Sequence, residues 1–429
     1  MAKIKAIQAR EILDSRGYPT IETTIWSDND HGAVASVPSG ASKGKYEAVE
    51  LRDNDPLRFS GRGVLKAAMN VNEIISPRLI GRDPTHQGEI DQILINLDNT
   101  PNKSRLGANA ILSVSQAVCE LGASVSDLQI FEYISAKYQF HVPTAFNLPT
   151  PIFNLINGGK HGGGNLDFQE FHLIPTSKLA FSKSLEIGEA IYQKLNEVLV
   201  SKNAIHSVGD EGGFAPNLKT NQDAIELLLE AIRACQLALN QQVFIGLDTA
   251  SSVLKVGNKY HIKDNANSMN GQEFIDFFTT LKREYNLFSL EDPLDEDAWE
   301  DWVKITSELG QDTMIIGDDL TVTSKTRLEK AISLHACNAV VVKPNQVGTI
   351  SEAVSFVKLA KTNNLSVIVA HRSGDTEDSF IADFAVGVGA DYAKFGAPAR
   401  GERVVKYNRL SLIEAYLRSK IPQNYVPNQ

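Results

Sequence analysis

Residues 314–346 read MIIGDDLTVTSKTRLEKAISLHACNAVVVKPNQ, and this stretch decides the fold class. Its two short apolar runs, 314–316 and 339–342, each end abruptly in charge, as strands buried on both faces of a parallel sheet do. Between them, residues 325–335 carry apolar side chains at helical spacing after Ser324, a residue type that favours helix starts. The stretch predicts a strand–helix–strand unit with Asp318 and Lys343 at the carboxyl ends of its strands.

The same pattern, an apolar run that ends in a polar residue, recurs on both sides of this unit. The residues that end these further runs are Asp248, Glu291, His371 and Lys394. Neighbouring ends are 23–28 residues apart, except for an interval of 43 after Asp248, where VLKVGNKYHIK predicts an extra hairpin. Six strands that bring polar groups to one rim predict an α/β barrel. The alternative is a doubly wound sheet in which these charges are ordinary loop residues.

Length and composition indicate a globular protein of two domains. The chain has 429 residues, a net charge of −10 and no long basic run, so we expect no nucleic-acid partner. Its N-terminus lacks an apolar signal core, and no apolar run is long enough to span a membrane, which favours a cytoplasmic protein. The three cysteines, Cys119, Cys235 and Cys337, are far apart in apolar surroundings and predict buried free thiols.

The order of the predicted elements divides the chain in two. Residues 3–37 predict a meander of three strands, and helices follow, one of them starting at Asp83-Pro84, as in an α+β domain. The proline-rich segment 141–151 suggests an N-terminal capping domain at 1–142 and a catalytic α/β barrel domain at 143–429. The barrel domain starts irregularly. A strand that carries Gln169 and Glu170 precedes two helices, around 179–201 and 220–239, before the regular rhythm begins at Asp248.

Three carboxylates at separate strand ends, those of Asp248, Glu291 and Asp318, form a set of hard oxygen ligands. Such a set favours Mg²⁺ over zinc. Lys343 lies at the end of a buried strand, where a charged side chain is unfavourable unless it has an ion-pair partner or a functional role. Burial and a nearby cation, Lys394 or the metal, are expected to lower its pKa and make it a usable base. The alternative is a salt-bridged structural lysine.

Four further stretches carry candidate site residues. Glu170 and Glu211 are expected to form a carboxylate pair in which repulsion raises one pKa and supplies a general acid. His161 lies in a glycine-rich loop, and Ser42 lies in another loop of the first domain, so either could close over a site. The strand end His371-Arg372-Ser373 combines donors that suit a phosphate or carboxylate. Each stretch, taken alone, also reads as an ordinary turn or surface loop.

Taken together, the motifs resemble the enolase family from end to end. They are DSRGYPT, VPSGAS, NGGKH with LDFQEF, GDEGGFAPN, LDTASS, LEDP, GDDLTVT, VVKPNQVGT, HRSGDTED and KFGAPARGER, in one order across both domains. The resemblance implies an N-terminal α+β cap on a TIM-like barrel with irregular first units. It also implies a lyase that reversibly dehydrates 2-phospho-D-glycerate to phosphoenolpyruvate in glycolysis and gluconeogenesis.

The resemblance also implies a role for each candidate residue. Lys343 takes the α-proton, and Glu211, supported by Glu170, protonates the leaving hydroxide. Two Mg²⁺ ions are expected, the first on Asp248, Glu291 and Asp318 and the second with the substrate phosphate and Ser42. The expected substrate contacts are His161, Gln169, Glu170, Glu291, Asp318, His371, Arg372, Ser373 and Lys394. A homodimer or higher homo-oligomer is implied as well.

The chain departs from the family's usual pattern at a few positions. Phe395 follows Lys394 where the family usually has threonine, and Lys43 follows Ser42 where threonine is also usual. One rival interpretation is another acid–sugar or amino-acid lyase of the superfamily, but those often carry a Lys-x-Lys pair where this chain has Gln169-Glu170. Another rival interpretation is a non-catalytic scaffold protein. The loss of Lys343, Glu211 or a metal-binding carboxylate would have supported it, but all of these residues are present.

Overall fold

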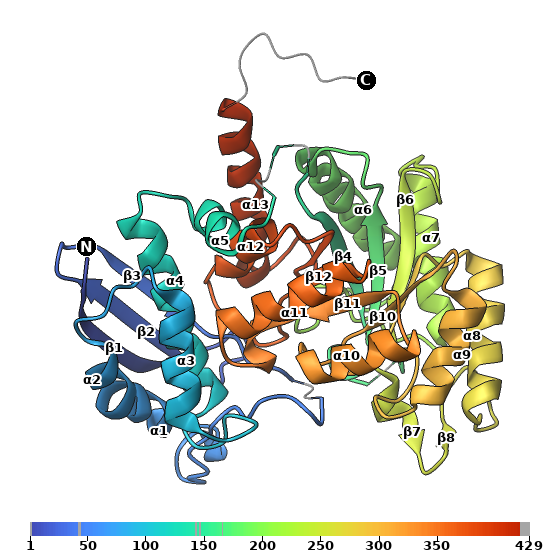
Figure 1. The fold of residues 1–429 in the computed structure, drawn as a ribbon. Coiled ribbons are helices and arrows are strands. Elements are labelled where there is room, and N and C mark those ends of the chain that lie inside the picture. Colours follow the sequence, from blue (N-terminus) through green and yellow to red (C-terminus); the bar gives the residue numbers. More distant parts are fainter. Residues whose placement is uncertain (1, 42–43, 142–143, 146, 165, 421–429) are drawn as a thin grey trace.

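The computed structural model describes residues 2–41, 44–141, 144–145, 147–164 and 166–420, and shows two parts side by side (Figure 1). The first part begins with an antiparallel meander, as expected from its alternating pattern. Its strands are β1 (Ile4–Leu13), β2 (Pro19–Ser27) and β3 (Gly32–Ser36). The helices that follow are α1 (Leu65–Met69), α2 (Ser76–Leu79), α3 (Gln87–Asp98), α4 (Ala108–Val125) and α5 (Ile130–Tyr138). Helix α4 packs against β2 and β3 and buries most of its length.

The second part is a closed barrel of eight strands, so the doubly wound alternative is wrong. Around the barrel the strands are β10 (Met314–Gly317), β11 (Ala339–Val342), β12 (Ser366–Ala370), β13 (Tyr392–Lys394), β4 (Thr150–Asn157), β5 (Glu170–Pro175), β6 (Val243–Asp248) and β9 (Ser289–Glu291). Strand β5 runs antiparallel to both of its neighbours, whereas the other neighbouring pairs are parallel. The irregular start predicted for the barrel domain therefore corresponds to β5, whose direction is reversed relative to the other strands of the barrel.

Helices cover the outside of the barrel (Figure 1). They are α6 (Phe181–Ser201), α7 (Asn221–Ala234), α8 (Gly271–Tyr285), α9 (Trp299–Leu309), α10 (Lys325–Leu334), α11 (Ile350–Thr362), α12 (Phe380–Gly387) and α13 (Gly401–Ser419). Helices α7 and α8 start with capping boxes, in which Thr220 and Asn270 exchange hydrogen bonds with the acidic residue three positions later. The extra hairpin is present as β7 (Lys255–Val256) and β8 (Lys259–Tyr260).

The barrel interior holds a small apolar cluster of its own, separate from the main core. Its buried members are Ile152, Ile174, Met314, Ile316, Ala339, Val341, Ile368 and Ala370. These side chains fill the barrel interior as a packed core. Polar groups on the same inward face therefore come together only beyond this layer, toward the carboxyl ends of the parallel strands.

Three local expectations need correction. Helix α3 begins at Gln87 and not at Pro84, because the Asp83 carboxylate accepts the backbone N–H of Thr85 and closes a turn first. Ser324 precedes α10 as expected, but its side chain makes no capping hydrogen bond. Cys119 and Cys337 are buried, whereas Cys235 is half-buried at the end of α7. The domain boundary at 142/143 falls outside the described residues and stays a prediction.

No helix in the described part of the chain has the length and apolar character needed to cross a membrane.

Candidate active site

The carboxyl ends of the barrel strands carry the candidate residues. Asp248, Glu291 and Lys394 are the last residues of β6, β9 and β13, and Asp318, Lys343 and His371 directly follow β10, β11 and β12. Glu170 is the first residue of β5, which reaches the same rim because that strand is reversed. Glu211 comes from the loop between α6 and α7. A parallel barrel gathers such residues at one end because all its parallel strands finish there.

One small cavity at this rim is lined by ten of the expected residues, Lys343 among them. Its lining consists of His161, Gln169, Glu170, Glu211, Asp248, Lys343, His371, Arg372, Ser373 and Lys394. Glu291 and Asp318 adjoin it through the lysines described below. Ser42, expected to reach the site from the first domain, lies outside the described residues, as does Lys43.

Lys394 is the central cation of the cavity. Its Nζ lies 2.7 Å from Glu291 Oε1 and 3.2 Å from both Asp248 Oδ2 and Glu170 Oε2. Burial alone would lower the pKa of this amine, but the surrounding carboxylates, Glu170 first among them, raise it well above its usual value. The surrounding carboxylates therefore favour the charged form of Lys394.

Lys343 forms an ion pair with Asp318 across the neighbouring strand ends. Burial opposes its charge, yet the Asp318 carboxylate raises the pKa of Lys343 above its ordinary value. The expected lowered pKa is therefore wrong, because the charged group nearest to the Lys343 amine is the carboxylate of Asp318 and not a cation. Arg372 and Lys394 act in the expected direction but more weakly than Asp318.

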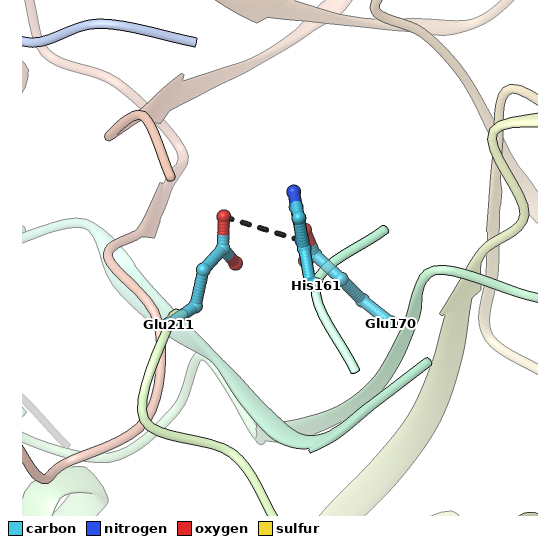
Figure 2. A group of neighbouring side chains, drawn as sticks. All are labelled: His161, Glu170 and Glu211. Carbon is cyan, nitrogen blue, oxygen red and sulfur yellow. Dashed lines mark ion pairs between the residues drawn. The ribbon is translucent and has the colours of Figure 1, made fainter. Parts of the chain in front are cut away.

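His161 lies between the two glutamates of the expected pair (Figure 2). Its Nδ1 is 3.4 Å from Glu170 Oε1 and 3.4 Å from Glu211 Oε1. Burial and the charge of Glu170 would raise the pKa of Glu211, but His161 and His371 outweigh them and lower it to about 2. The pKa of His161 is raised, against its burial, chiefly by Glu211. The expected raised carboxyl pKa is thus wrong here, because the two neighbouring histidines favour the ionised form of Glu211.

The stretch His371-Arg372-Ser373 lies between the two domains. Arg372 Nη1 is 2.8 Å from Glu47 Oε2, and Ser373 Oγ accepts the backbone N–H of Ala41 at 2.7 Å. His371 Nε2 is 3.3 Å from Glu211 Oε2. Both loop contacts come from the N-terminal domain, which therefore closes this side of the cavity.

Comparison with known proteins decides the family. The model of the enolase N-terminal domain matches residues 4–134, and that of the enolase C-terminal TIM barrel domain matches residues 145–425. The enolases of Helicobacter pylori strains P12 and J99 are each 43% identical over 422 residues, which cover 98% of this chain and 98% of each relative. The chain belongs to the enolase family. Its class is therefore that of a carbon–oxygen lyase of glycolysis, and the predicted family, fold and enzyme class are confirmed.

The enolase family requires a divalent metal, and the charges at this rim fit one. Burial and neighbouring carboxylates raise the pKa of Asp248 and raise that of Glu291 well above its usual value. Glu291 Oε2 is buried and has no hydrogen-bond partner among the described residues. Excess buried negative charge with an unused carboxylate oxygen is an arrangement that a hard cation satisfies.

Two groups among the described residues bring a ligand atom of each member within 4.8 Å of the others. They are His161 with Glu170 and Glu211, and Asp292 with Asp318 and Asp319. Of the expected enolase trio, Asp318 belongs to the second group, while Asp248 and Glu291 are bridged by Lys394. Asp292 holds this second group in shape, because its carboxylate accepts the backbone N–H groups of both Asp318 and Asp319.

The structure also explains one departure from the usual enolase pattern. Phe395 is fully buried and packs against the ring of Tyr407, at 6.1 Å between centroids, so it contributes to the core and not to the cavity lining. Asn154 and Glu47 are among the residues that contact the site and were missed at the sequence level. Asn154 Nδ2 donates to Glu211 Oε2 at 2.9 Å, and Glu47 pairs with Arg372. Asn154 interrupts the apolar run PIFNLIN, a signal that could have found it, whereas nothing in the local sequence marks Glu47.

Proposed function

We propose that this chain interconverts 2-phosphoglycerate and phosphoenolpyruvate, with Lys343 as base and Glu211 as acid. The observation that carries this proposal is that both residues line one small cavity yet come from separate elements, the end of β11 and the loop before α7. Dehydration needs a base for the α-carbon and an acid for the leaving hydroxide, and these two groups supply them from independent supports.

Lys343 takes the proton from the carbon beside the substrate carboxylate. This proton is barely acidic, and its loss places a second negative charge on the carboxylate end of the substrate. Lys394, a fixed cation beside Lys343 at the same rim, stabilises that charge. Lys343 must lose its own proton before it acts, and its pairing with Asp318 opposes this.

Asp248, Glu291 and Asp318 are the residues that would hold the first Mg²⁺, and Ser42 with the substrate phosphate would hold a second. Such ions would supply positive charge at the carboxylate end of the substrate. With the Asp318 carboxylate engaged in this way, the amine of Lys343 would be free to act as a base.

Glu211 delivers the proton that leaves with the hydroxide. The pKa of His161 is raised by Glu211, and its Nδ1 lies 3.4 Å from Glu211 Oε1, so the two groups act as one coupled acid. Glu170, on the other side of His161, supports its charge. His161 belongs to the glycine-rich loop and closes over the reacting atoms.

Arg372, Ser373 and His371 bind the phosphate end of the substrate, with Gln169 near the carboxylate end. Arginine offers a planar pair of donors that matches phosphate oxygens, and a neighbouring hydroxyl adds a further donor. We also propose that the enzyme acts in the cytoplasm as a homodimer or higher homo-oligomer.

The test is an absorbance assay that follows phosphoenolpyruvate formation from 2-phosphoglycerate with and without Mg²⁺. Formation of product that depends on Mg²⁺ supports the proposal. Absence of product at every Mg²⁺ concentration would overturn it.

A further inference from the structure

The two glutamates of the cavity are held in the same way. In each, Oε1 faces His161 Nδ1 at 3.4 Å. In each, Oε2 accepts from a barrel residue: His172 Nε2 lies 2.8 Å from Glu170 Oε2, and Asn154 Nδ2 lies 2.9 Å from Glu211 Oε2. Because an ionised carboxylate only accepts hydrogen bonds, Nε2 of His172 carries the proton in this contact.

The two donors are partners across neighbouring strands. Asn154 on β4 lies directly opposite His172 on β5 in the antiparallel register. Residues so placed have Cβ atoms about 4.5–5.5 Å apart. His172 alternates with Glu170 and Ile174 along β5, and Asn154 follows Ile152 by two, so both donors are on the inward face of the barrel. They therefore form a polar layer between the glutamates above and the apolar cluster below.

Packing alone does not explain these two residues. Both side chains are completely buried, and each leaves one polar atom, His172 Nδ1 and Asn154 Oδ1, without a partner within the described ranges. A buried polar atom with no hydrogen bond destabilises the fold. Their neighbours on the same inward face are isoleucines, so the barrel has an apolar alternative at this depth.

We infer that Asn154 and His172 are positioning residues which hold Glu211 and Glu170 with one carboxylate oxygen presented to His161. By tying each Oε2 to the barrel wall, they fix the rotation of the carboxylate and leave Oε1 for proton transfer. A small displacement of a catalytic acid lowers the reaction rate strongly, because proton transfer requires the acid to lie within hydrogen-bond distance of the reacting atom. The inference rests on the proposed function, in which Glu211 and Lys343 act on different bonds.

Leucine at either position removes the donor at similar volume. The variants His172→Leu and Asn154→Leu leave Oε2 of each glutamate with its remaining contact, Lys394 at 3.2 Å or His371 at 3.3 Å. Leucine also removes the buried polar atom that has no partner, which offsets the lost hydrogen bond, so we expect melting temperatures close to that of the unaltered enzyme. Turnover is expected to fall about 10- to 100-fold, the size of a lost hydrogen bond to a charged group. Exchange of the α-proton with deuterated solvent, which depends on Lys343, is expected to fall much less.

Three further variants sharpen the test. Ile152→Val and Ile174→Val alter the same strands and the same inward face without touching a carboxylate, and should keep both rates. His172→Gln restores an N–H donor and should recover part of the turnover that His172→Leu loses. The double variant His172→Leu with Asn154→Leu should lose little more than the worse single variant, because both donors serve one cluster around His161.

The outcomes separate this inference from the proposed function. An unaltered enzyme that neither exchanges the α-proton nor forms product would overturn the proposed function itself. If that enzyme is active but His172→Leu and Asn154→Leu match the isoleucine controls, the positioning role is wrong. A parallel loss of exchange and turnover, with a lowered melting temperature or no benefit from glutamine, would assign the two residues to structure instead. Turnover lost ahead of exchange in stable proteins supports the inference.

Discussion

Arg372 Nη1 lies 2.8 Å from Oε2 of Glu47, and this buried ion pair joins the barrel rim to the N-terminal domain. Both side chains are less than a tenth exposed. The guanidinium that is expected to bind the substrate phosphate therefore already has a protein carboxylate as its partner. We therefore expect substrate and Glu47 to compete for the same donors, so that the N-terminal domain influences substrate affinity.

Removing the charge of Glu47 should strengthen phosphate binding. In Glu47→Gln the substrate phosphate has to displace only a neutral amide from the Arg372 guanidinium, and not a carboxylate. We therefore expect the KM for 2-phosphoglycerate to fall about tenfold, an effect of the size of one hydrogen bond to a charged group. Steady-state kinetics measures this directly. Glu352→Gln is the matched control, because the Lys103–Glu352 pair also bridges the two domains without lining the cavity. A KM that rises in Glu47→Gln would show that the pair orients Arg372 for substrate.

Chelation should abolish activity, and Mg²⁺ should restore it, because the rim holds more buried carboxylate than its lysines neutralise. Asp318→Asn keeps the shape of the side chain but removes its charge, so both Mg²⁺ affinity and turnover should fall. Calorimetric titration of the metal together with the absorbance assay tests this. Activity that survives exhaustive dialysis against a chelator would contradict the metal requirement.

Mg²⁺ binding should release protons and tighten as the pH rises. Burial and the adjacent Asp318 raise the pKa of Asp319 to about 8. A cation bound at Asp318 would lower this pKa and so release the proton that Asp319 carries below that pH. In the unfolded chain the Asp319 carboxyl loses its proton above pH 3.8, whereas in the folded protein it keeps the proton up to about pH 8. Asp319 therefore makes the free energy of unfolding fall as the pH rises from 3.8 to about 8. Titration calorimetry in buffers of different ionisation enthalpy counts the released protons. A count of zero at pH 7 would contradict the prediction.

Lys343→Ala and Glu211→Gln should fail at different steps. Loss of a positioned acid or base costs about 10²–10⁴-fold in rate. Lys343→Ala should lose both product formation and α-proton exchange with deuterated solvent. Glu211→Gln should lose product formation and keep some exchange, because the base and Lys394 remain. Exchange at the unaltered rate in Lys343→Ala would point to another base, with Lys394 the first to examine.

Gly209→Ala should displace His161 without unfolding the protein. A Cβ at Gly209 would lie 2.4 Å from the backbone oxygen of His161 and 2.8 Å from Asn157 Oδ1, so the loop that carries the imidazole must shift. We expect turnover to fall about 10²-fold, the typical effect of a misplaced catalytic group. Gly88→Ala, in open space near the start of α3, is the control and should keep activity with stability unchanged or raised by up to about 1 kcal/mol. Equal activity of the two variants would contradict a role for the loop position.

The barrel and most of the candidate residues could be predicted from local sequence patterns. Strands buried on both faces read as continuous apolar runs, and the residue that breaks each run must lie where the strand leaves the core. Asp248, Glu291, Asp318, Lys343, His371 and Lys394 were found by this rule alone, since it depends only on local pattern. Their roles came from the ordered motifs of the enolase family.

The pairing and the charge of these residues could not be predicted in this way, because they depend on the three-dimensional arrangement of the chain. The pKa of a buried group depends on its nearest charges, and these come from segments far apart in the chain: Lys343 faces Asp318, Glu211 faces His161 and His371, and Arg372 faces Glu47. No local pattern records such distances. The direction of β5 was equally hidden, because an apolar run reads the same whether its strand runs up or down the barrel, yet its reversal brings Glu170 to the rim.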